Sequence, residues 1–99
     1  MSDIKDVITD DDLLAYLGID YADDPMVKTN LARAFNTAQG ELLESVGEDY
    51  PVDHPLTPEL ALLYASASYE QRDLAGNEIK RASDIALKLR LYMRRRSDG

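Results

Sequence analysis

The residues with the clearest catalytic potential are one histidine and the aspartate before it, Asp53-His54. An imidazole beside a carboxylate can serve as a general base or as a metal ligand. A metal site needs several ligands, however, and His54 is the only histidine in a chain without cysteine. A serine nucleophile would also have to rely on His54 as its base. We therefore predict no enzyme, no metal site and no cofactor.

Clusters of aspartate raise a second chemical possibility, a cation site. Asp10-Asp11-Asp12 lacks the glycine and the closing glutamate of a calcium-binding loop. The triplet follows Thr9, so it is better explained as a helix start, where carboxylates meet the positive pole of the helix. The pair Asp23-Asp24 is weak evidence for acid–base chemistry, because a chain with 19 acidic residues contains such pairs by chance.

Charge is distributed unevenly along the chain. The net charge of −8 argues against general nucleic-acid binding, which needs clustered Lys and Arg. Residues 1–24 hold eight Asp and one Lys, a net charge of −7, whereas residues 80–99 hold seven Lys or Arg and two Asp, a net charge of +5. Ends of opposite sign suit head-to-tail contact between copies, which closes into a ring when the rotation allows. The alternative is that both ends are simply solvated.

Length and composition indicate one domain spanning residues 1–99. The absence of cysteine excludes disulfides, and no apolar run approaches the roughly 20 residues that a membrane helix needs. The acidic N-terminus does not have the pattern of a signal peptide, so we expect production in a cytoplasm. We expect residues 1–8 and 97–99 to be frayed.

The pattern predicts an all-α fold, a small bundle of about four helices. Thr9 or Asp10 caps the first helix, which Gly18 ends. The second helix begins at Pro25 after its cap Asp24 and runs to about Val46. Gly40, inside this helix, would allow a neighbouring helix to approach. Expected core positions of the two helices are Leu13, Leu14, Leu17, Val27, Leu31, Phe35 or Ala34, Ala38, Leu42 and Val46.

The third helix is predicted to begin with Thr57 as its cap and Pro58 in its first turn, and to end at Gly76. Small residues between positions 61 and 68 should allow a neighbouring helix to pack closely. The last helix is expected from about Ser83, with Ile85, Leu89, Tyr92 and Met93 as its apolar seam. Its final residues, Arg94, Arg95 and Arg96, either complement the negative pole of the helix or dock on an acidic surface.

A long loop, residues 47–56, separates the second and third helices. It holds two prolines and three acidic residues, and it is long for a helix–helix connection in so small a domain. Because long loops often carry contacts, it is the first candidate for partner binding. Its candidate contact residues are Tyr50, Val52, Asp53 and His54.

Three segments, in order, give the chain its resemblance to a known family. They are DDDLLAYLGIDYADDPMV, ARAFNTAQGELLESVG and PELALLYASASYEQRDLAG. Their order resembles the small head–tail connector (adaptor) proteins of tailed bacteriophages, also called phage DNA-packaging proteins. A Tyr–Glu–x–Arg element closes the family's third helix, and here it is Tyr69, Glu70 and Arg72. The resemblance covers about residues 9–76, and the short loop expected at residues 76–82 departs from the family's longer one.

The resemblance implies a structural role in the virion neck, after assembly in the host cytoplasm. Such proteins form a ring, twelve-fold when assembled, beneath the portal protein. The ring extends the DNA channel without binding DNA specifically and receives further neck or tail-completion proteins. By this resemblance, residues 47–56 and about 83–96 would make assembly contacts. From the residues themselves, Glu70 and Asp73 flank Arg72, which we expect to bond a carboxylate of its own or a neighbouring subunit. The alternative is a small acidic regulator that binds a basic DNA-binding protein.

Overall fold

The computed structural model describes residues 1–20 and 23–98, which form a short 3-10 turn and four α-helices. The predicted all-α fold, with a long loop between the second and third helices, is confirmed. Positions 21 and 22, in the predicted turn between the first two helices, lie outside the described residues, as does position 99. The elements are η1 (Ile4–Asp6), α1 (Asp10–Leu17), α2 (Pro25–Ser45), α3 (Thr57–Tyr69) and α4 (Gly76–Asp98).

The first two helices begin where the sequence predicts. The Thr9 hydroxyl accepts from the Asp12 N–H at 3.1 Å, and the Asp12 carboxylate accepts from the Thr9 N–H at 2.8 Å, which makes a reciprocal capping box. Gly18 ends α1 in the left-handed conformation, with φ +74°. The Asp24 carboxylate caps α2 by accepting from the Met26 N–H at 2.8 Å.

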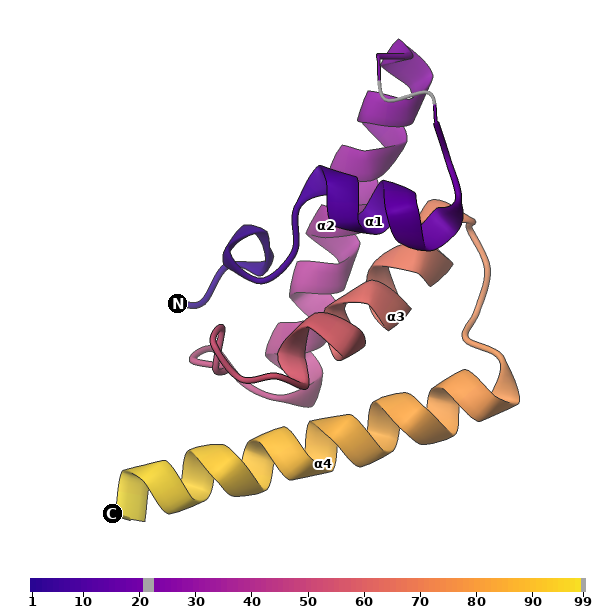
Figure 1. The fold of residues 1–99 in the computed structure, drawn as a ribbon. Helices are drawn as coiled ribbons and strands as arrows, with labels where there is room; N and C mark the ends of the chain where they lie inside the picture. The colour runs from indigo at the N-terminus through magenta and orange to yellow at the C-terminus, as the bar shows by residue number, and fades with distance from the viewer. Residues whose placement is uncertain (21–22, 99) are drawn as a thin grey trace.

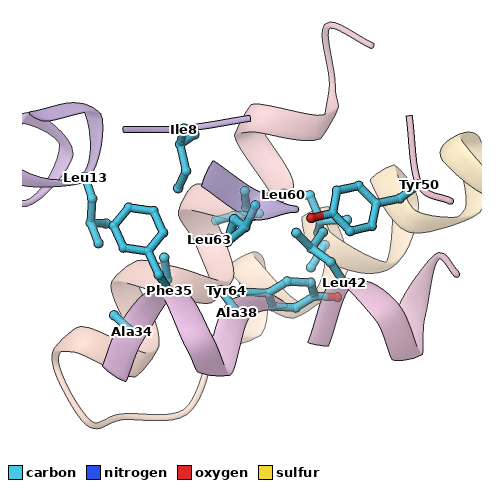
Figure 2. Close-up of a cluster of buried hydrophobic side chains, with 14 of the residues drawn as sticks. Ile8, Leu13, Ala34, Phe35, Ala38, Leu42, Tyr50, Leu60, Leu63 and Tyr64 are labelled. Atoms are coloured by element: carbon cyan, nitrogen blue, oxygen red, sulfur yellow. The ribbon is translucent and has the colours of Figure 1, made fainter. Parts of the chain in front are cut away.

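The α2–α3 pair forms the centre of the core (Figure 2). Ala34 and Ala38 of α2 and Ala61 of α3 are completely buried, and such small side chains let two helices pack closely. Gly40 makes no such approach, because a Cβ placed there would meet nothing within 4 Å. The predicted apolar stripe of α2 is buried, as are Leu13 and Leu14 of α1.

The prediction that residues 1–8 are frayed is wrong. Ile4 and Ile8 are each only 2% exposed, so both are core residues. The Gln39 side chain of α2 holds the segment in place, since its carbonyl accepts from the Ile4 N–H at 2.9 Å and its amide donates to the Ser2 carbonyl at 2.6 Å. The Ser2 N–H also donates to the Glu48 carbonyl at 2.8 Å. At the other end α4 continues to Asp98, so the expected fraying of residues 97 and 98 is not seen.

The boundary between the last two helices also differs from the prediction. α3 ends at Tyr69 and not at Gly76, because the chain turns at Gln71, whose φ is +54°. The Arg33 guanidinium of α2 donates to the Tyr69 carbonyl at 3.1 Å and so satisfies the end of α3. Gly76 is therefore the first residue of α4, which begins before Ser83.

The predicted cap of α3 is wrong as well. Thr57 is the first helical residue, completely buried, and its hydroxyl donates to the Pro51 carbonyl at 2.7 Å instead of capping. Leu56 occupies the N-cap position without a side-chain hydrogen bond. Thr57 thus ties the long loop to the helix that follows it.

The helix α4 lies along the body on the side of α3 away from α1 (Figure 1). Its inner face is buried against α3 through Ala82, Ile85, Ala86 and Leu89, and Met93 is half-buried. The molecule is elongated, with extents of 46 × 27 × 19 Å. No helix within residues 1–20 and 23–98 is long and apolar enough to span a membrane.

Candidate interaction surfaces

The loop between α2 and α3 does not expose Tyr50, so the prediction that Tyr50 contacts a partner is wrong. Its ring is 1% exposed, and its hydroxyl donates to the Gln39 side-chain carbonyl at 2.5 Å. Burial, with smaller effects from Asp3 and Asp6, raises the pKa of Tyr50 to about 12. Tyr50 is therefore a core residue that joins the loop to α2.

His54 packs against α4. Its ring meets the Tyr92 ring edge-on, with centroids 4.7 Å apart and planes at 71°. The His54 Nδ1 accepts from the Leu56 N–H at 3.1 Å, which fixes the ring's orientation. Within the described chain, no three His, Asp or Glu side chains gather as a metal site. Of the four loop candidates, Asp53 alone is exposed, while Val52 and His54 are half-buried.

The Tyr69-Glu70-Arg72 element forms the joint between α3 and α4. The Arg72 guanidinium donates to the Glu70 carboxylate at 3.0 Å and to the two Glu78 oxygens at 2.8 and 3.3 Å. These hydrogen bonds hold the pKa of Glu78 below its usual range and raise that of Arg72. Arg72 is thus paired within its own chain, which is one of the two predicted arrangements.

The Glu78 carboxylate has a second role at the start of α4. It accepts from the Ala75 N–H at 2.9 Å, so the third residue of the helix satisfies the N–H that precedes it. A further ion pair joins α4 to α3, where Arg81 donates to Glu59 through two contacts of 2.8 Å. Sequence reasoning missed the Arg72–Glu78 and Arg81–Glu59 ion pairs, because each depends on where α4 begins.

The helix α4 differs in charge from the rest of the molecule. It carries seven Lys or Arg and three Asp or Glu, a net charge of +4. The rest of the chain carries four Lys or Arg and sixteen Asp or Glu, a net charge of −12. Arg94, Arg95 and Arg96 are exposed, and the Arg96 guanidinium lies 5.7 Å from the Tyr92 ring centre. The outer face of α4 also exposes Leu87 and Leu91, which the predicted seam did not include.

A groove lies at the other end of α4, where α2, α3 and the α3–α4 joint meet. Its volume is about 760 Å³. The half-buried Glu41 carboxylate is the charged group that α2 contributes to it. Sequence reasoning missed this groove, because it depends on the early end of α3. Its lining consists of Thr37, Glu41, Tyr64, Ala67, Ser68, Gln71, Arg72, Asp73, Leu74 and Ile79.

Comparisons of the chain with protein-family models, with curated proteins and with solved structures find no match. The resemblance to phage connector proteins therefore stays a prediction. The candidate interaction surfaces are α4, with its basic C-terminal end, and the acidic remainder of the molecule.

Proposed function

We propose that this chain is a structural protein of the neck of a tailed bacteriophage. It assembles as a ring beneath the portal protein, extends the DNA channel and joins head to tail after DNA packaging. The observation that carries the proposal is the separation of charge, a helix of net charge +4 on a body of net charge −12. This separation suits a subunit that must bind both its own copies and a larger assembly.

The placement of charge supports ring formation. The acidic first turn of α1 and the basic α4 lie on opposite sides of α3 (Figure 1). Surfaces of opposite sign on opposite sides of one subunit favour heterologous contacts, which close into a ring when the rotation is suitable. A net-negative ring also lets DNA pass without adhering, because acidic walls repel phosphate.

The residues proposed to contact partners are fewer than the sequence indicated. Burial removes Tyr50 from the list, and Arg72 is already paired with Glu70 and Glu78. Asp53 is exposed on the loop, and Arg94–Arg96 are exposed at the end of α4. We therefore assign the contacts of assembly, with the portal protein and with neighbouring copies, to the C-terminal half of α4, with Asp53 beside it on the loop.

A pull-down tests the proposal. The tagged chain is added to a lysate of phage-infected or prophage-induced source cells, and co-purifying proteins are identified by mass spectrometry. We expect portal and neck proteins, and a loss of portal protein with the R94E/R95E/R96E variant. The control variant K5E/K28E changes exposed lysines outside α4 and should retain it. Recovery of a repressor or a polymerase subunit without virion proteins would refute the neck assignment.

The acidic body favours a second function, binding of a basic regulatory protein. A surface of net charge −12 outside α4 has the sign of nucleic acid and suits contact with a DNA-binding domain. The same pull-down separates the two functions. A discrete complex of one or two copies with a DNA-binding protein would support the regulator, whereas a larger assembly with portal protein supports the connector.

A further inference from the structure

The groove between α2, α3 and the α3–α4 joint contains a carboxylate without a charge partner. Glu41 is half-buried there. Burial raises the pKa of Glu41, the nearby Glu44 raises it further, and no cation in the described chain offsets either effect. A cation from outside the chain would compensate for this loss of solvation. Asp73, exposed on the α3–α4 joint, adds a second negative charge to the lining, where the Arg72 guanidinium is already paired with Glu70 and Glu78.

The wall of the groove is held in a defined shape. Gln71 adopts φ +54°, a conformation that L-residues other than Asn and Asp seldom take. The Gln71 N–H donates to the Ser68 carbonyl at 3.1 Å, and the Arg72 N–H donates to the Ala67 carbonyl at 3.0 Å. These bonds, with the Arg72–Glu78 ion pair, fix the turn that carries Asp73 and Leu74. The groove is therefore a preformed surface.

The C-terminal turns of α4 have the complementary character. Leu87, Leu91 and Arg94 follow one another at spacings of four and three, so they share one face of the helix. Leu87 is 48% exposed and Leu91 is 42% exposed. Arg94 and Arg95 are exposed. The C-terminal end of α4 therefore presents an exposed apolar stripe, Leu87 and Leu91, followed by the positive charges of Arg94 and Arg95.

The two features lie at opposite ends of α4 (Figure 1), since Ile79 at the start of the helix lines the groove. A helix of 23 residues spans roughly 34 Å. The basic end therefore cannot reach the groove of its own chain, but it can reach the groove of another copy.

We infer that the last turns of α4 of one copy seat in the groove of a second copy, with Arg94 and Arg95 facing Glu41 and Asp73. Leu91 then packs against Leu74 and Ile79, which line the groove. The contact is heterologous, so it repeats along a ring or a fibre. As an account of the neck ring the inference rests on the proposed function, but the contact itself does not require a phage partner.

The test is sedimentation of the purified full chain over a range of concentrations and salt. We expect the average mass to rise with concentration and more strongly at low salt, because the contact is charged. E41K and R94E/R95E should each weaken self-association by about tenfold or more. The controls are E48K and K5E/K28E, which make the same charge changes at exposed positions outside the groove and α4 and should self-associate normally. Circular dichroism verifies that every variant is folded.

Mixing E41K with R94Q/R95Q is the decisive experiment, because glutamine, unlike glutamate, brings no reversed charge that could pair with the reversed groove of E41K. E41K keeps a functional α4 end, and R94Q/R95Q keeps a functional groove, so each mixed pair can make one contact and no more. We expect a discrete 1:1 complex at twice the chain mass of 11.1 kDa. Closed rings or open fibres of the wild type both support the inference. It is overturned if the wild type stays monomeric, if the mixture stays monomeric, or if the control variants are weakened equally.

The outcomes for this contact and for the proposed function are separable. A chain that self-associates as described but captures no virion protein refutes the neck assignment and leaves the contact intact. A chain that captures portal protein but stays monomeric on its own in sedimentation overturns the contact and leaves the neck assignment intact.

Discussion

Replacing Ile8 by alanine tests whether the N-terminal segment belongs to the folded core. Ile8 is 2% exposed, so the variant removes three buried carbons, worth about 2.4 kcal/mol in transfer free energy. The cavity left behind brings the loss of unfolding free energy to about 3–4 kcal/mol. For a domain of this size that corresponds to a midpoint roughly 15–25 °C lower.

Thermal and urea denaturation followed by circular dichroism measure this change. The control is Lys5→Ala in the same segment, an exposed side chain whose removal should change stability by less than about 0.5 kcal/mol. If the segment were frayed in solution, I8A and Lys5→Ala would both have nearly the stability of the wild type. An I8A midpoint within 2–3 °C of the wild type would therefore refute the burial argument.

Three further predictions concern α4 and its joint. Glu78→Gln should lower stability at pH 7 by about 1 kcal/mol through its weakened cap and ion pair. Because the folded-state pKa of Glu78 is lowered, its contribution is present at neutral pH and lost as pH falls below about 4.5, so wild type and variant should converge in acid denaturation curves. Tyr92→Ala removes the edge contact with His54, worth about 0.5–1.5 kcal/mol, and should speed amide exchange in the last turns of α4 while leaving α2 unchanged. Gln71→Gly should raise the free energy of unfolding by about 0.5–1 kcal/mol, because glycine adopts the positive φ without strain; a lower urea midpoint would contradict this.

The helices α1 and α2 could be predicted from sequence because their signals are local. Thr9 and Asp24 cap them, and the apolar residues of α2 follow the helical period that the structure buries. The close packing of α3 was also predictable, because small residues such as Ala61 and Ala65 allow another helix to approach at short distance.

The end of α3 could not be predicted, because non-local contacts set it. Leu74 continues the apolar period, and Gly76 has the position of a helix end. The chain turns earlier because Arg33 of α2 bonds the last carbonyls of α3 and Arg72 pairs with Glu78 across the joint. A helix boundary that depends on a residue in another helix leaves no local pattern. The groove exists because α3 ends early, so sequence reasoning that placed the end of α3 too late also missed the groove.

Burial of short segments was unpredictable for a similar reason. Ile4 and Ile8 stand among charged residues, and Tyr50 stands among prolines and acids, so neither context indicates a core. Gln39 brings them together, since its side chain bonds both the N-terminal segment and the Tyr50 hydroxyl. A polar residue on the side of a helix gives no sequence signal of such a role.

The hydrogen bonds of the N-terminal segment also set an order of events in folding. Its partners lie 35 to 48 positions further along the chain, so on the ribosome Ile4 and Ile8 emerge before these partners and find their places only after Tyr50 has followed them. Contacts between such distant positions are costly to form before the rest of the chain is ordered. The segment should therefore close the domain late, and I8A should speed unfolding while leaving the folding rate nearly unchanged in stopped-flow measurements. A segment that is made before its partners is then the last part of the domain to be protected from proteases.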